Sequence, residues 1–206
     1  MAERTSGWHA ILSSPVVFEL VQHAVGARAW LKGFVRETIR PQPGERMLDV
    51  GCGPAAILRY LPDVDYCGFD HSAAYIESAR RQFSGRGRFF CDDINSIHAH
   101  GVGPFDVAIA IGVLHHIDDE QALGLFAKVH EVLAPGGRLL TADPCFFDGQ
   151  PWITRLVVAN DRGMNVRHFA EYPALARRTF PKTTTELNAA VLPFPRAVCQ
   201  MACRKD

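Results

Sequence analysis

The chain has 206 residues, with 22 Lys and Arg balanced by 22 Asp and Glu, and 48% of its residues are hydrophobic. This length suits one domain, and the composition excludes a disordered or fibrous protein. A net charge of zero argues against a general nucleic-acid binder, which carries a basic excess or stripe. No apolar run reaches the roughly 18–20 residues of a membrane span, and the N-terminus does not resemble a signal peptide.

Six cysteines are spread along the chain, and no two of them form a Cys-x-x-Cys pair. Most of them lie among strand-like apolar residues, which predicts buried free thiols in a reducing, cytoplasmic environment. No spacing of His, Cys and acidic residues indicates a metal site. The cysteines are Cys52, Cys67, Cys91, Cys145, Cys199 and Cys203.

In chain order, residues 15–40 carry apolar side chains at three- and four-residue intervals, and their two glycines predict two helices or a kinked one. Pro41-Gln42-Pro43-Gly44 ends this region. Short apolar runs, typical of buried parallel strands, then alternate with helical segments. The expected strands are 46–50, 65–70, 88–91, 105–111 and 138–142, and the expected helices are 55–61, 72–82 and 118–133.

The alternation stops after Asp143. We expect two helices joined by a loop in residues 145–181. The two strand-like runs that follow, Thr183–Val191 and Ala197–Arg204, predict an antiparallel hairpin at the sheet edge. We therefore predict an α/β fold: a Rossmann-like three-layer sandwich with a mostly parallel seven-stranded sheet and an antiparallel C-terminal hairpin strand. It forms a single domain over 1–206. Its parts are N-terminal helices (1–44), a core of alternating strands and helices (45–144), a helical cap (145–181) and the C-terminal hairpin (182–206).

A glycine loop, Gly51-Cys52-Gly53-Pro54, lies between the first core strand and the helix after it. Asp70 follows Gly51 by 19 residues, at the end of the next strand, where a carboxylate can accept hydrogen bonds from ribose hydroxyls. This spacing fits a dinucleotide-binding loop. Asp49 distinguishes a dinucleotide from a cationic ligand. A carboxylate just before the loop disfavours a pyrophosphate and favours a ligand with positive charge, such as S-adenosylmethionine.

These segments resemble the motifs of class I S-adenosylmethionine-dependent methyltransferases. The matching stretches are MLDVGCGPA (47–55), YCGFDHS (66–72), RFFCDDI (88–94), FDVAIAIGVLHHIDD (105–119) and EVLAPGGRLLTADP (131–144). The resemblance implies S-adenosyl-L-methionine as cofactor and S-adenosyl-L-homocysteine as product. The cofactor-binding residues that it implies are Asp49, Gly51, Gly53, Asp70, His71, Asp92, Asp93, Ile94, Ile111 and Gly112.

Within this set the resemblance assigns different parts of the cofactor to different residues. Gly51 and Gly53 would line the methionine part and Asp49 its ammonium, while Asp70 would bind the ribose and Ile94 would pack on the adenine. Two consecutive acids follow the third strand, so the adenine contact falls on Asp93 or, as the alternative, Asp92. Ala55 replaces a glycine often found in the first motif, and we expect this replacement to be tolerated if φ is negative there.

Methyl transfer from a sulfonium is an in-line displacement, in which alignment and exclusion of water supply much of the rate. An alcohol or phenol acceptor benefits from a base, and His115 or His116, after the fourth strand, could provide it. The alternative for these histidines is a packing role. The cap supplies the candidates for binding the acceptor: Trp152, Arg155, Arg167, His168 and Tyr172.

The leading prediction is thus methyl transfer to an O or N atom of a small molecule. A nucleic-acid acceptor is not expected, because the Asn/Asp-Pro-Pro-aromatic motif of exocyclic-amine methyltransferases is replaced by Ile111-Gly112-Val113-Leu114. Two alternatives stay open: an NAD-dependent oxidoreductase, and a module that binds S-adenosylmethionine without catalysis. The sequence does not predict the oligomeric state.

Overall fold

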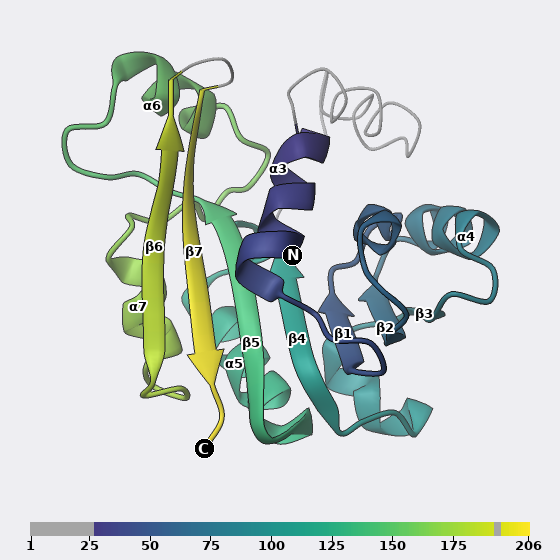
Figure 1. Cartoon of the computed structure of the whole chain (residues 1–206). Coiled ribbons are helices and arrows are strands. Elements are labelled where there is room, and N and C mark those ends of the chain that lie inside the picture. Colours follow the sequence, from purple (N-terminus) through teal and green to yellow (C-terminus); the bar gives the residue numbers. More distant parts are fainter. Residues whose placement is uncertain (1–26, 192–194) are drawn as a thin grey trace. The chain divides into compact units, whose positions relative to one another are not determined.

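The structure, a computed structural model, describes residues 27–191 and 195–206 (Figure 1). Seven strands form one mixed sheet. They are β1 (Arg46–Val50), β2 (Asp65–Asp70), β3 (Arg88–Cys91), β4 (Phe105–Ile111), β5 (Leu133–Pro144), β6 (Thr183–Ala190) and β7 (Arg196–Arg204). The strand order is β3-β2-β1-β4-β5-β7-β6. The predicted α/β class and the mixed sheet are therefore confirmed.

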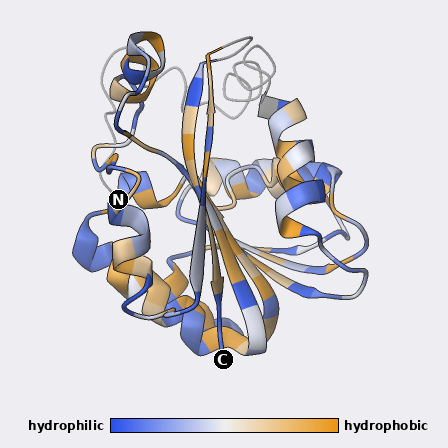
Figure 2. Cartoon of the chain, turned by 60° about the vertical axis from the view of Figure 1, so that its left-hand side comes forward, coloured by the Kyte–Doolittle hydropathy of each residue, from blue (hydrophilic) through white to orange (hydrophobic). Residues whose placement is uncertain are grey.

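The described helices differ in type as well as in length. The α-helices are α3 (Ala27–Phe34), α4 (Ala73–Gln82), α5 (Asp119–Val132), α6 (Trp152–Ala159) and α7 (Glu171–Ala176). A π-helical segment, η1 (Val35–Ile39), continues α3, and the 3-10 segments are η2 (Ala56–Arg59), η3 (Ile94–His100) and η4 (Leu114–His116). Along the helices, hydrophobic and hydrophilic residues lie on different faces, as Figure 2 shows.

The chain divides into two compact units, and the boundary falls inside β4, between Ile109 and Ala110. We call the described residues up to Ile109 the first unit and those from Ala110 the second unit. The predicted boundaries, with a core extending to residue 144, do not coincide with this division. The single-domain organisation stays a prediction.

In the first unit, β1 pairs in parallel with β2 on one side and with β4 on the other, and β2 pairs in parallel with β3. Four of the five residues of β1 are buried, as its continuous apolar sequence predicts for a central strand. Ser72 caps α4 by accepting a hydrogen bond from the Tyr75 amide. The parallel pairing brings the carboxyl ends of β1, β2 and β3 to one edge of the sheet, where ligands bind in open α/β folds.

In the second unit, β7 lies between β5 and β6 and is antiparallel to both (Figure 1). The Gly112 amide donates to the Ala142 carbonyl at 2.8 Å, which joins the end of β4 to β5. A capping box between Asp118 and Gln121 begins α5, whose buried residues recur with helical spacing. The expected cap helices and the hairpin are therefore present as α6, α7, β6 and β7.

In the N-terminal region, α3 runs through Gly33 to Phe34 and continues as the π-helical η1, and the remainder of the predicted N-terminal helices lies outside the described residues. Two other local expectations are wrong. Ala134-Pro135-Gly136-Gly137 belongs to β5, which begins at Leu133 directly after α5. The predicted helix 55–61 is only the 3-10 segment η2.

All six cysteines are free, and all except Cys91 are buried. Burial raises the pKa of the Cys67 thiol to about 11 and that of Cys145 to about 12. The thiols of Cys52 and Cys199 have pKa values raised by the same cause. The expectation of buried free thiols therefore holds for five positions and is wrong for Cys91.

Candidate functional site

The glycine loop of the first unit is held tightly against β2. The amides of Gly51 and Cys52 both donate to the Phe69 carbonyl, at 2.8 and 3.0 Å. Gly51 and Gly53 have φ values of 69° and 53°, in the left-handed region that glycine enters without steric cost. The two glycines therefore allow the chain to leave β1 and turn sharply across the end of β2.

Ala55 has a backbone conformation that is unusual for alanine. Its φ is 54° and its side chain is fully buried, so the negative φ on which its tolerance was made conditional is not present. A left-handed conformation costs an L-residue roughly 1–2 kcal/mol, while burying a methyl group recovers roughly 0.8 kcal/mol. Glycine, which often occupies this position in the family that the sequence resembles, would avoid this strain.

Asp70 ties the glycine loop to the start of α4. Its carboxylate accepts hydrogen bonds from the Gly53 amide at 2.9 Å and from the Ser72 amide at 2.8 Å. The side chain of Asp70 is buried, whereas His71 is exposed, with its Nδ1 3.8 Å from the carboxylate. The loop amide of Gly53 thus faces a carboxylate of the protein.

Asp49, on β1, is the second buried carboxylate of this unit, with 4% of its surface exposed. The Tyr66 hydroxyl donates to its Oδ2 at 2.5 Å. Burial raises the pKa of Asp49 from 3.8 to about 7, the Tyr66 hydrogen bond opposes this rise, and the charge of Asp70 adds to it. A cationic group beside Asp49 would stabilise the ionised form, so this position favours a positively charged ligand.

The two acids after β3 have separate local partners. Asp92 donates its amide to the Asp70 carbonyl at 3.1 Å and places Oδ2 3.0 Å from Nε2 of His100, whose hydrogen bond lowers the pKa of Asp92. Asp93 caps η3 by accepting from the Asn95 amide at 2.8 Å, and Ile94 is buried. The assignment of the adenine contact to either acid stays a prediction. The partnership of His100 with Asp92 was not anticipated from the sequence.

In the second unit, His115 lies between two carboxylates. Its Nδ1 is 2.9 Å from Oδ1 of Asp143, which also accepts the His115 amide at 3.2 Å, and its Nε2 is 3.1 Å from Oδ1 of Asp161. Burial lowers the pKa of His115, but the hydrogen bonds and charges of the two aspartates outweigh burial and raise it to about 9. In this arrangement the ring is an imidazolium at neutral pH and cannot accept a proton.

Neither Asp143 nor Asp161 was predicted as a site residue. Asp143 lies near the end of β5 and is 1% exposed, and its Oδ2 has no hydrogen-bond partner among the described residues. Asp161 follows α6, and its pKa is lowered because the His115 interactions outweigh its desolvation. A polar residue at the carboxyl end of a parallel strand was a usable signal for Asp143, whereas nothing in the local sequence distinguishes Asp161.

The segment after α6 packs directly on His115. A Cβ atom at Gly163 would lie 2.1 Å from Cδ2 of His115, so only glycine fits there without a shift. The Asn165 amide donates to the His115 carbonyl at 2.9 Å, and the Gly163 amide donates to Asp161 at 2.8 Å. His116 is also buried, with its ring centroid 4.0 Å from that of His115.

Comparisons with known proteins agree with the motifs. The family described as methyltransferase domain matches residues 48–139. The structure of the S-adenosylmethionine-dependent methyltransferase SibL in its apo form has a TM-score of 0.72 at 20% identity, covering 100% of this chain and 63% of that one. The predicted S-adenosylmethionine-dependent methyltransferase fold is thereby confirmed.

Two curated relatives differ in the acceptors that their names give. Probable tRNA methyltransferase 9B of Mus musculus is 34% identical over 116 residues, which are 55% of this chain and 25% of the relative. An O-methyltransferase of Pyrenophora dematioidea is 34% identical over 125 residues, which are 57% of this chain and 46% of the relative. The chain therefore spans between a quarter and a half of the length of these two relatives.

The predicted acceptor-binding residues fall into two groups. Trp152 is 74% exposed, Arg155 is exposed and lies over the Phe146 ring at 5.3 Å, and half-buried His168 has its Nε2 3.5 Å from Asp148. Arg167 and Tyr172 are buried, and their polar atoms make hydrogen bonds to other groups of the protein.

Arg167 makes hydrogen bonds with three of its nitrogens, to Asp119 at 2.9 Å and to the carbonyls of Leu114 and Ile117 at 2.6 and 2.8 Å. The Tyr172 hydroxyl donates to the Pro144 carbonyl at 2.8 Å. Both side chains therefore anchor the cap to the segments around η4 and the end of β5.

No group of three or more His, Cys, Asp or Glu residues in the described part of the chain is arranged to hold a metal ion. Over the same described residues, no helix combines the length and apolar character that a membrane-spanning segment needs.

Proposed function

We propose that this chain transfers a methyl group from S-adenosylmethionine to an O or N atom of a small-molecule acceptor. The observation that carries the proposal is the pair of buried carboxylates, Asp49 and Asp70, beside the glycine loop. Buried carboxylates are stabilised by a cationic ligand. S-adenosylmethionine, when bound, supplies an ammonium, a sulfonium and the methyl group to be transferred. In the proposal the cofactor is held by the residues that the sequence motifs imply, with Asp49 facing its ammonium.

An NAD-dependent oxidoreductase is disfavoured by the same loop. A dinucleotide-binding loop directs free backbone amides and the N-terminus of a long helix at a pyrophosphate. Here the Gly53 amide is bonded to Asp70, and the loop is followed by the four-residue segment η2. A short 3-10 segment provides little of the dipole that favours an anion.

The proposed role of His115 is to take the proton that an O–H or N–H acceptor loses. Only an unprotonated Nε2 can do this, and in the described structure Asp161 occupies that nitrogen. We propose that the acceptor displaces Asp161 from Nε2 of His115. This nitrogen is then available to accept the proton, while Nδ1 stays hydrogen-bonded to Asp143. Asp143 then holds the ring through Nδ1, which fixes its tautomer and orientation.

Two arguments support a small acceptor over tRNA, although one relative is named a probable tRNA methyltransferase. The 206 residues carry no net charge, whereas phosphate backbones are bound by a basic excess. The O-methyltransferase relative shows that the matched region also serves enzymes named for oxygen acceptors.

Six free cysteines support a reducing compartment, and we propose the cytoplasm.

The first experiment is a thermal-shift assay with S-adenosylhomocysteine and, in parallel, NAD at equal concentrations. A ligand that binds the folded state raises the melting temperature by mass action. We expect a rise with S-adenosylhomocysteine alone. A rise with NAD and none with S-adenosylhomocysteine would overturn the proposed cofactor.

The second experiment follows tritium from the labelled methyl group of S-adenosylmethionine into metabolite fractions and, separately, into bulk tRNA. We expect label in a metabolite fraction. Label in tRNA alone would replace the small acceptor by a nucleic acid. Cofactor binding without transfer into either pool would favour the non-catalytic module.

A further inference from the structure

Tyr66 is not among the residues that the sequence motifs assign to the cofactor, yet it makes a direct hydrogen bond to Asp49. Its side chain is fully buried, and its hydroxyl lies 2.5 Å from Oδ2 of the carboxylate. Asp49 is on β1 and Tyr66 is on the neighbouring strand β2. A hydrogen bond between two buried groups on adjacent strands fixes the carboxylate in one orientation.

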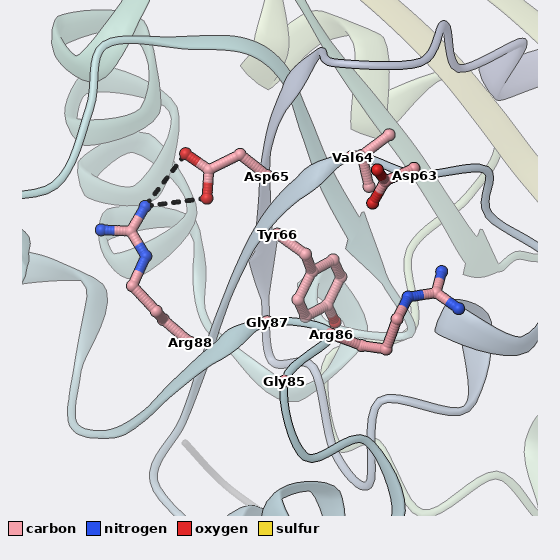
Figure 3. Close-up of a pocket in the computed structure, with 8 residues that line it drawn as sticks. All are labelled: Asp63, Val64, Asp65, Tyr66, Gly85, Arg86, Gly87 and Arg88. Atoms are coloured by element: carbon pink, nitrogen blue, oxygen red, sulfur yellow. Dashed lines mark hydrogen bonds and ion pairs between the residues drawn. The ribbon is translucent and has the colours of Figure 1, made fainter.

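Two glycines make room for the Tyr66 ring. A Cβ atom at Gly87 would lie 2.8 Å from Cδ1 of the ring, and one at Gly68 would lie 3.1 Å from Cε1 and 2.7 Å from the sulfur of Cys52. Figure 3 shows the ring beside Gly87, where it lines a pocket of about 250 Å³. The ring is therefore positioned by close packing on the sides of both glycines.

Resting on the proposed function, we propose that Tyr66 is a positioning residue for the cofactor: its hydroxyl keeps the Asp49 carboxylate oriented and ionised to receive the ammonium of S-adenosylmethionine. An orientation fixed before binding lowers the entropic cost of binding. Without the hydroxyl, the buried carboxylate would lose its hydrogen-bond donor and would more readily hold a proton.

The other titratable groups around Asp49 do not replace this donor. The charge of Asp70 disfavours an ionised Asp49, and Cys52 is a buried neutral thiol whose own pKa is raised. Of the contributions to the Asp49 pKa, the Tyr66 hydrogen bond is the one that favours ionisation. The proposal therefore makes cofactor affinity depend on pH through Asp49, with the midpoint set by Tyr66.

The test compares two ligands in wild type and Tyr66→Phe by isothermal titration calorimetry between pH 6 and 8.5. S-adenosylhomocysteine carries the ammonium, and 5′-methylthioadenosine lacks the whole amino-acid part. We expect Tyr66→Phe to weaken S-adenosylhomocysteine about tenfold at pH 7 and to move the rise of its affinity to higher pH. The affinity for 5′-methylthioadenosine should be unchanged. Tyr60→Phe is the control, because it removes a hydroxyl from a half-buried tyrosine of the same unit.

Equal losses for both ligands, or an unchanged pH profile for S-adenosylhomocysteine, would overturn the role of Tyr66. Failure of wild type to bind either ligand would instead overturn the proposed function. Gly87→Ala provides a second variant that keeps the hydroxyl but pushes on the ring. It should weaken S-adenosylhomocysteine selectively, in the same direction as Tyr66→Phe.

Discussion

Replacing Asp49 by Asn is expected to stabilise the protein at neutral and alkaline pH while weakening cofactor binding. Burial raises the pKa of Asp49 from 3.8 to about 7, so between these values the folded chain holds a proton that the unfolded chain has released. The free energy of unfolding therefore falls as pH rises through this window, by 1.36 kcal/mol for each pH unit. Above pH 7 the ionised carboxylate costs the ligand-free protein roughly 4 kcal/mol, and Asn does not carry this cost.

Urea unfolding of the ligand-free proteins at pH 5 and pH 8 measures this difference. Relative to wild type, Asp49→Asn should gain about 3 kcal/mol between the two pH values. His115 also titrates in this range, but it is present in both proteins and cancels in the comparison. Asp63→Asn, at an exposed position of the same unit, is the control for losing one negative charge.

The same comparison can refute the reasoning. A stability difference that is the same at pH 5 and pH 8 would mean that Asp49 does not titrate differently in the folded and unfolded states. Calorimetry with S-adenosylhomocysteine at pH 8 completes the test, because Asp49→Asn should weaken it at least about tenfold. Unchanged affinity would remove Asp49 from the proposed cofactor site.

Three further predictions concern the second unit. Arg167→Ala should lower the free energy of unfolding by roughly 3 kcal/mol or more in urea titrations, whereas Asp119→Ala, at a 71% exposed side chain, should cost less than about 1 kcal/mol. Gly163→Ala should reduce methyl transfer at least about tenfold, because its methyl group displaces His115; an unchanged rate would contradict that packing. In Asp161→Asn, NMR titration should show a lower His115 pKa than in wild type, because one of the two carboxylates that raise it is lost, and the rising limb of the pH–rate profile should move to lower pH.

Much of the fold was predictable because the relevant signals are local. Apolar runs with glycine-rich turns predict the strands, and Ser72 and Asp118 mark helix starts through side chains that bond the first-turn amides. The place of Asp49 and Asp70 at strand ends also follows from the sequence. The conformation of Ala55 does not, because tertiary packing imposes a left-handed φ that alanine does not prefer.

The contacts of the site were less predictable because they join residues far apart in the chain. Asp161 reaches His115 from 46 residues away, and the Arg167 guanidinium bonds carbonyls around η4 from about 50 residues away. An arginine in a basic stretch is equally compatible with a side chain exposed to solvent and with one that binds an anion. Only the folded chain shows that the guanidinium of Arg167 donates hydrogen bonds to backbone carbonyls. The hydrogen bond of Tyr66 to Asp49 is also not predictable from the sequence, because a tyrosine within an apolar strand is typical of a core residue.

The unequal exposure of the thiols makes this protein suitable for single-site labelling without mutagenesis. Cys91 is the exposed cysteine, while the other five are buried, and burial raises the pKa of the Cys67 and Cys145 thiols. A maleimide fluorophore at pH 7 should therefore attach chiefly to Cys91. This residue ends β3, directly before Asp92 and Asp93, and its sulfur lies 3.7 Å from the His71 carbonyl. A dye placed there would lie at the end of the sheet that carries the glycine loop, where it could serve as a probe for ligands of this loop.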